Sequence, residues 1–179
     1  MEAEKTLCIM GLFDRAATDA FLELRDLLAR NGFETDDQPP HLTFGIYDSV
    51  DRDAFSSWIE TSAARQKEIE LAFHHIGVFR PGTVFAEPCV SMDLLDLHKR
   101  LHGRYDQACV AANCLYSLKA KSWVPHTTLL TVTSQSELCR AIPLLLDRFS
   151  PIQATITQLA ITQFPPMKTL RTFPLQKPG

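Results

Sequence analysis

The chain has 179 residues, of which 45% are hydrophobic and 22% charged, and its formal net charge at pH 7 is −3. A chain of this length and composition builds a core of its own, which excludes disordered, collagen-like and coiled-coil proteins. No apolar run approaches the roughly 18 residues of a membrane span, and acidic residues precede the first apolar stretch, so we interpret the protein as cytoplasmic, without a secretory signal.

Strands and helices alternate in the first half of the chain. Asp14 is a candidate N-cap, Phe21, Leu24 and Leu28 recur at helical spacing after it, and Asn31-Gly32 marks the helix end. The predicted elements are a strand over 5–13, a helix over 14–30, a strand over 41–47, a helix over 51–64, a strand over 69–79 and its hairpin partner over 83–91.

The second half repeats this order of elements. A helix over about 92–109 is followed by an irregular segment that ends at Pro125, and the remaining predicted elements are a strand over 126–132, a helix over 136–149 and strands near 152–164 and 168–175. The charge differs between the halves, because residues 1–85 carry a net −7 and residues 86–179 a net +4. A phosphate would be drawn to the second half if these charges clustered in space.

A constant offset of 85 residues relates the two halves. It pairs Pro40 with Pro125, His41 with His126, Thr43 with Thr128, Ile76 with Ile161 and Phe79 with Phe164. A duplicated unit keeps such an offset between equivalent residues. We therefore predict one bilobal domain over residues 1–179, in which two similar lobes bring the histidine strands to a shared groove.

The repeated Pro-His-x-Thr sequence suits phosphodiester chemistry. Alternation along a strand puts His41 and Thr43 on one face, about 7 Å apart, and His126 with Thr128 likewise. Histidine titrates near pH 6.5, so one imidazole can act as base and the other as acid, while threonine hydroxyls donate hydrogen bonds to the phosphate oxygens. The arrangement requires no metal and no cofactor.

The two H-x-T motifs, His41-Leu42-Thr43 and His126-Thr127-Thr128, resemble those of the 2H phosphoesterase superfamily, which includes bacterial 2'-5' RNA ligase-like proteins and 2',3'-cyclic phosphodiesterases. The resemblance implies an α+β fold with two lobes of antiparallel sheet, pseudo-twofold symmetry, flanking helices and a central cleft. It also implies that His41 and His126 are acid and base, that Thr43 and Thr128 hold the phosphate, and that the substrates are RNA ends or small nucleotides.

Further residues are candidates for substrate binding. Lys119, Lys121 and Trp123 precede the second motif and would place a ring beside two ammonium groups, unless they form an ordinary solvated loop with one packed tryptophan. Tyr47 shares the predicted polar face of His41 and either stacks on a base or caps the lobe.

A metal site is not expected. His98 and His102 have the i, i+4 spacing of a metal-binding pair, but Lys99 and Arg100 lie between them, so we interpret both as surface histidines. The five cysteines form no CxxC pair and are expected to be reduced.

Three functions remain open at this point. The first is a metal-independent phosphodiesterase that acts on 2',3'-cyclic phosphates or 2'-5' linkages. The second is 2'-5' RNA ligation, the reverse reaction in the same cleft, and the third is a protein that binds nucleotides or RNA ends without turnover. We expect a monomer that takes RNA ends or small nucleotides and makes no membrane contact.

Overall fold

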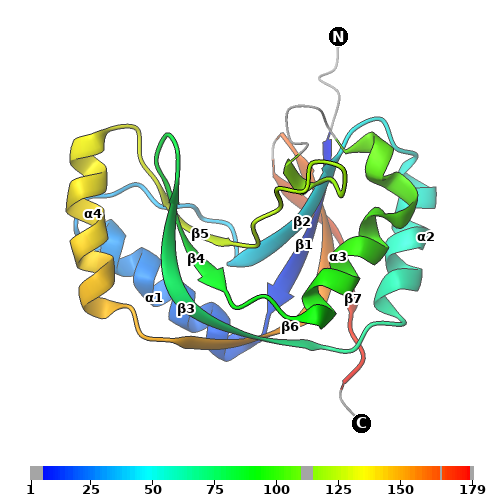
Figure 1. Cartoon of the computed structure of the whole chain (residues 1–179), viewed down its shortest axis with the longest axis horizontal. Helices are drawn as coiled ribbons and strands as arrows, with labels where there is room; N and C mark the ends of the chain where they lie inside the picture. Colours follow the sequence, from blue (N-terminus) through cyan, green and yellow to red (C-terminus); the bar gives the residue numbers. More distant parts are fainter. Residues whose placement is uncertain (1–5, 110–114, 166, 178–179) are drawn as a thin grey trace.

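The computed structural model describes residues 6–109, 115–165 and 167–177, and its elements follow the predicted order (Figure 1). The strands are β1 (Thr6–Phe13), β2 (His41–Tyr47), β3 (Ile69–Phe79), β4 (Thr83–Pro88), β5 (Thr127–Thr131), β6 (Ile152–Phe164) and β7 (Lys168–Pro174). The helices are α1 (Arg15–Arg30), α2 (Arg52–Ala63), α3 (Met92–Tyr105) and α4 (Gln135–Arg148), with a 3-10 turn, η1 (Asp106–Ala108), where the helix predicted over 92–109 ends early.

Each α-helix in the described residues begins at a side chain that caps it. The oxygen of the cap accepts a hydrogen bond from the backbone N–H three residues later, which satisfies one of the unpaired donors of the first turn. The capping residues are Asp14, Asp51, Ser91 and Ser134. The expectation that Asp14 starts the first helix is therefore confirmed.

Seven strands of the described residues form one antiparallel sheet, which confirms the predicted α+β class. The strand order is β2-β1-β6-β3-β4-β5, and β7 pairs with β6. Although β2 and β5 lie at opposite ends of this order, Cα atoms of the two strands come within 8 Å of each other. The sheet therefore curls until the two strands that begin with the histidine motifs face one another.

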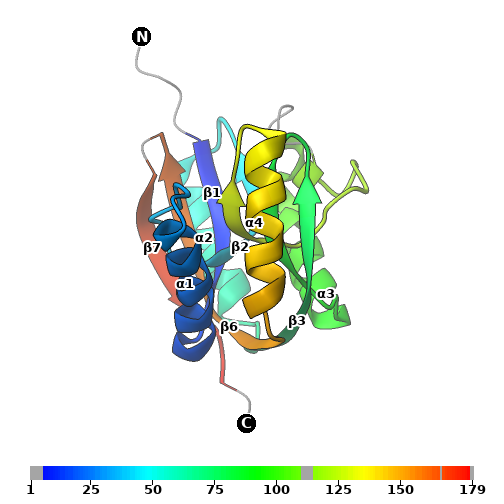
Figure 2. The ribbon, with the colours of Figure 1, turned by 90° about the vertical axis from the view of Figure 1, so that its left-hand side faces the viewer.

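The helices cover the sheet in two pairs. Helices α1 and α4 pack together beside β5, and α2 and α3 pack together beside β2 and β7 (Figures 1 and 2). Each pair takes one helix from each half of the sequence, and β6 of the second half pairs with β1 of the first. The acidic and basic halves are thus interwoven, so their opposite charges are not divided between separate lobes.

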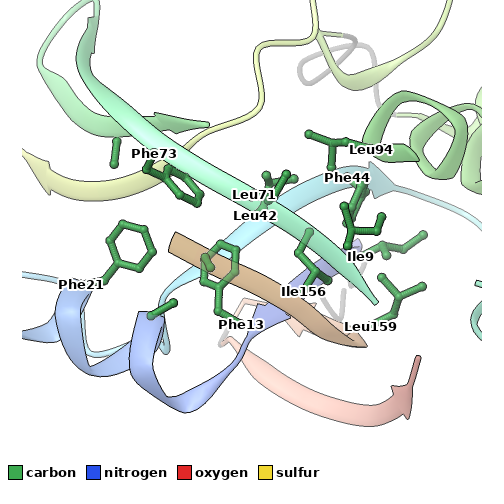
Figure 3. Packing of buried hydrophobic residues seen from close by; sticks show 14 of the residues in the cluster. Ile9, Phe13, Phe21, Leu42, Phe44, Leu71, Phe73, Leu94, Ile156 and Leu159 are labelled. Carbon is green, nitrogen blue, oxygen red and sulfur yellow. The ribbon is translucent and has the colours of Figure 1, made fainter. Parts of the chain in front are cut away.

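Aromatic rings join the helices to the sheet in the core. The rings of Phe13, Phe21 and Phe73 lie 5.0–5.7 Å apart between β1, α1 and β3, two of the three pairs edge to face (Figure 3). Phe21 and Phe73 are completely buried, and burying such a ring contributes about 2–3 kcal/mol. None of the described helices is long and apolar enough to cross a membrane.

Candidate active site

The two motif histidines are held by the same backbone contact. His41 opens β2, and its Nδ1 atom lies 2.8 Å from the carbonyl oxygen of Pro39. His126 directly precedes β5, and its Nδ1 atom lies 2.8 Å from the carbonyl oxygen of Val124. A carbonyl oxygen only accepts, so Nδ1–H donates in both rings and Nε2 is the basic nitrogen of the neutral form.

Both histidines line one cavity of about 430 Å³. Burial is the main cause that lowers the pKa of each histidine. The charges of Arg25 and His126 lower the pKa of His41 further. The charge of His126 thus acts on His41, as expected for two imidazoles that share one cavity. The cavity is lined by Asp36, His41, Phe79, Thr83, Leu115, Tyr116, Ser122, Trp123, Val124, His126, Thr128, Thr131 and Met167.

The two motif threonines differ in their surroundings. Thr128 is half-buried and lines the cavity. Thr43 is also half-buried, but its hydroxyl group hydrogen-bonds with the thiol of Cys8 on the neighbouring strand and it is not among the lining residues. Three of the four motif residues therefore meet at the cavity, while Thr43 lies beside it.

A β-bulge follows each motif at the equivalent position. Ile9 and Met10 of β1 pair with Gly45 and Thr43, so Phe44 is the extra residue. In the same way, Val84 and Phe85 of β4 pair with Leu130 and Thr128, so Leu129 is extra. One extra residue inverts the alternation of side chains beyond it.

Because of the bulge in β2, the expectation for Tyr47 is wrong. The predicted alternation put Tyr47 on the face of His41, but its side chain is completely buried. The ring of Tyr47 packs 5.0 Å from Phe55 and 5.4 Å from His102. It therefore caps the core, as the alternative interpretation had it, and has no surface on which a base could stack.

An aromatic wall supports His126. The imidazole lies 5.0 Å from the ring of Phe79 and 5.3 Å from that of Phe85, which stack on each other at 4.1 Å. Gly77 makes this possible, because a Cβ atom there would lie 2.4 Å from the Phe85 ring. The packing limits rotation of the imidazole and excludes water from one side of it.

Arg25 of α1 is a buried cation that sequence analysis did not single out. Its Nη1 atom donates to the carbonyl oxygens of Asp36 and Gln38, just before the first motif, and its Nη2 atom donates to that of Thr128 at 2.8 Å. One guanidinium thus ties the approach to β2 to the backbone of β5. The available signal was its position four residues after Phe21, on the apolar face of the helix.

The predicted substrate-binding loop is only partly at the cavity. Trp123 lines it, and the indole Nε1 donates to the carbonyl oxygen of Thr43 at 3.2 Å. His98 covers one face of this ring, with ring centroids 3.8 Å apart. Trp123 therefore forms part of the cavity wall and cannot be sandwiched between two bases. Lys119 and Lys121 are exposed and are not among the lining residues; their contact with substrate stays a prediction.

The interpretation of His98 and His102 as surface histidines is wrong. Both are buried, with 5% and 0% of their surface exposed. Their partners come from β2 and from residues after α3, which no local pattern indicates. Within residues 6–109, 115–165 and 167–177, no group of three or more His, Cys, Asp and Glu side chains is arranged to hold a metal ion.

A known protein family matches most of this chain. A family model described as the 2'-5' RNA ligase superfamily matches residues 14–164. No curated protein sequence matches the chain.

Solved structures share the fold at low sequence identity. E. coli LigT in complex with NADP+ has a TM-score of 0.66 at 15% identity, over 97% of this chain and 98% of that one. TT0787 of Thermus thermophilus has a TM-score of 0.68 at 14% identity, over 97% and 100%. Kluyveromyces marxianus Usb1 has a TM-score of 0.53 at 10% identity, over 96% and 98%. E. coli LigT has also been solved with 3'-AMP, with a TM-score of 0.63 at 17% identity, over 97% of this chain and 99% of that one.

Proposed function

Since the chain belongs to the 2'-5' RNA ligase superfamily, as its two H-x-T motifs indicated, we propose that it is a metal-independent phosphodiesterase. Its substrates are 2',3'-cyclic phosphates or 2'-5' linkages in RNA ends or small nucleotides. His41 and His126 are its acid and base. No cofactor takes part.

One observation carries this proposal. Two histidines that are 85 residues apart line the same cavity, and each donates Nδ1–H to the carbonyl oxygen two residues before it. In both rings Nε2 is therefore the nitrogen that exchanges protons with substrate. Nε2 of one histidine accepts a proton and Nε2 of the other donates one. A pure phosphate-binding site has no need of two such groups, because arginines or helix N-termini bind phosphate more simply.

The reaction is balanced by one proton at each histidine. The neutral imidazole takes a proton from water as the water oxygen bonds to phosphorus, and the bond from phosphorus to the 2' or 3' oxygen breaks. The imidazolium gives its Nε2 proton to that leaving oxygen, and exchange with solvent resets both rings. Burial lowers the pKa of both histidines in the empty site. The negative charge of a bound phosphate acts in the opposite direction and favours the protonated form of the acid.

The threonines stabilise the charge that develops on the phosphate. Thr128 lines the cavity and donates its hydroxyl hydrogen to a non-bridging oxygen, an interaction worth a few kcal/mol in preorganised sites. Thr43 takes the equivalent place after turning from Cys8. The nucleotide complexes of E. coli LigT support a nucleotide as the occupant.

Ligation is the second candidate, and the description of the matching family favours it. The same acid and base serve both directions by microscopic reversibility. We expect hydrolysis to dominate at low concentrations of RNA ends, because water is then the more abundant nucleophile.

The proposal is tested by incubating the purified protein with 2',3'-cyclic mononucleotides, 2'-5' linked dinucleotides and RNA ends. Products are separated by chromatography, with and without EDTA, and ligand binding is measured in parallel. We expect cyclic phosphates to open at a rate that EDTA does not change. Binding without turnover across the whole panel would instead identify a nucleotide-binding protein, and loss of activity with EDTA would contradict the metal-independent mechanism.

The remaining expectations belong to the same proposal. We expect the active form to be a monomer. Cytoplasmic location and the absence of membrane contact stay predictions from the sequence.

A further inference from the structure

An ion pair with a buried histidine lies beside His98, whose ring covers one face of Trp123 in the cavity wall. The side chain of His102 in α3 is completely buried, its Nδ1 atom 2.9 Å from Oδ1 of Asp106 and its Nε2 atom 2.8 Å from the carbonyl oxygen of Phe44. A carboxylate only accepts, so Nδ1–H of His102 donates to Asp106, and the hydroxyl of Tyr47 also lies within 3.2 Å of Nε2. Neither member of the pair lines the cavity.

Asp106 connects this pair to the loop of residues 115–124. The hydroxyl of Ser117 donates to Oδ2 and the backbone N–H of Leu118 donates to Oδ1, each at 3.0 Å. Partial burial raises the pKa of Asp106, but these bonds and the charge of His102 outweigh it and hold the pKa below the usual value. The carboxylate is therefore ionised and bridges the end of α3 and the loop.

His98 forms a second link to the same loop, one helical turn before His102. Its Nε2 atom lies 2.9 Å from the carbonyl oxygen of Tyr116, and its ring lies parallel to that of Trp123 at 3.8 Å, with an interplanar angle of 4°. Burial and the charge of His102 lower the pKa of His98 to about 4. His98 is thus neutral and donates to Tyr116.

The loop supplies most of the large apolar side chains that line the cavity. Its lining residues are Leu115, Tyr116, Ser122, Trp123 and Val124. Other lining residues, among them His41, His126 and Thr128, carry polar groups. A ligand that fills the cavity would place its phosphate against these polar groups and its sugar and base against the loop.

We propose that the His102–Asp106 ion pair is a positioning device that holds the loop of residues 115–124 against β2 and thereby sets the affinity for the nucleoside part of the substrate. The inference rests on the proposed function. It assigns the phosphate to the histidine motifs and the nucleoside to a wall whose position depends on α3. Loss of the ion pair then weakens nucleotide binding and leaves phosphate binding nearly intact.

The test compares Asp106→Asn with Asp96→Asn. Asparagine keeps the shape of Asp106 and its Oδ1 acceptor but removes the charge, while Asp96 is an exposed carboxylate on the same helix. Dissociation constants for 3'-AMP and for inorganic phosphate are measured by calorimetry. We expect Asp106→Asn to weaken 3'-AMP binding about 10-fold, as for the loss of a charged hydrogen-bonded partner, and phosphate binding by less than about twofold.

Ser117→Ala is a milder variant that removes one bond between Asp106 and the loop and leaves the ion pair in place. It should weaken 3'-AMP binding in the same direction by a smaller factor. For cyclic-nucleotide turnover, Asp106→Asn should raise KM about 10-fold and leave kcat within about threefold. In a Trp58→Phe background, the emission of Trp123 should change in Asp106→Asn and not in Asp96→Asn.

The outcomes separate the two proposals. If Asp106→Asn lost 3'-AMP and phosphate affinity equally, or lost neither, the positioning role would be overturned. Turnover of cyclic nucleotides by the wild-type protein would still support the proposed phosphodiesterase. A wild-type protein that binds neither ligand and turns over no cyclic nucleotide would overturn the proposed function and the inference that rests on it.

Discussion

Strands β2 and β5 carry the same motif and the same bulge, but different groups cover their exposed edges. The carbonyl oxygens of Thr43 and Phe44 in β2 accept from the rings of Trp123 and His102. The carbonyl oxygen of Thr128 in β5 accepts from the guanidinium of Arg25. An edge strand exposes unpaired backbone groups, and here side chains from distant segments satisfy them. Two equivalent chemical units are thus positioned by unrelated supports.

Removing either histidine should have the largest effect and tests whether the two motifs are equivalent in catalysis. His41→Ala and His126→Ala should each lower kcat by about 10²–10⁴-fold, because each removes one partner of the proton transfer. His75→Ala, at an exposed position of β3, is the matched control. Thermal unfolding should remain within a few degrees of wild type. Full activity in either motif variant would remove the histidine pair from the mechanism.

Arg25→Met tests the support of β5 against that of β2. The change leaves three carbonyl oxygens without their charged donor, which we expect to lower the free energy of unfolding by about 3 kcal/mol. Urea denaturation measures the loss. Arg15→Met, on the exposed side of the same helix with a side chain 95% exposed, should change stability little. If the two variants were equally stable, Arg25 would not be what holds the two motifs together.

The threonines should show the asymmetry of the two motifs directly. Thr128→Val should lower kcat by about 10–10²-fold, because in the proposed mechanism its hydroxyl donates to the phosphate. Thr43→Val should cost several-fold less, since the hydroxyl of Thr43 first gives up its bond with Cys8. The exposed Thr172→Val variant serves as control. Equal losses would mean that both hydroxyls bind the phosphate equally well once substrate is present.

The dependence of activity on pH is the smallest expected effect. Burial lowers the pKa of His41 and His126 from 6.5, so the general acid of the free enzyme loses its proton as pH rises through a value below 6.5. As pH rises, kcat/KM should therefore begin to fall below pH 7. The fall in kcat should occur at higher pH, because the bound phosphate favours the imidazolium. A kcat/KM that stays flat from about pH 5.5 to 8 would contradict this assignment.

Much of the local structure around the candidate site followed from local patterns. The motif at His41 opens a strand with the predicted bounds 41–47, and the strands predicted to end at Phe79 and Phe164 do so. The duplication itself stays a prediction. The prediction for Tyr47 is wrong because the bulge at Phe44 inverts side-chain alternation; Gly45 was the available signal, since an isolated glycine in a strand often marks a bulge.

The burial of three polar side chains was also not predicted from the sequence. Arg25 lies on the apolar face of its helix but carries a charge, and His98 and His102 flank two charged residues. A charged or titratable side chain is buried only where partners satisfy it. Those partners include carbonyl oxygens of β2, of β5 and of the loop after η1. Their presence depends on how segments far apart in the chain pack together.

The amino-acid sequence by itself determined the chemical groups and their local presentation: two imidazoles and two hydroxyls, each pair at alternate positions of a strand that follows a proline. The tertiary structure decided which of these groups share a cavity, which threonine faces it and which buried cations hold its walls. The physical reason is range. Strand alternation and helix capping act within a few residues, whereas the curl of the sheet that brings β2 to β5 is the summed result of packing along the whole chain.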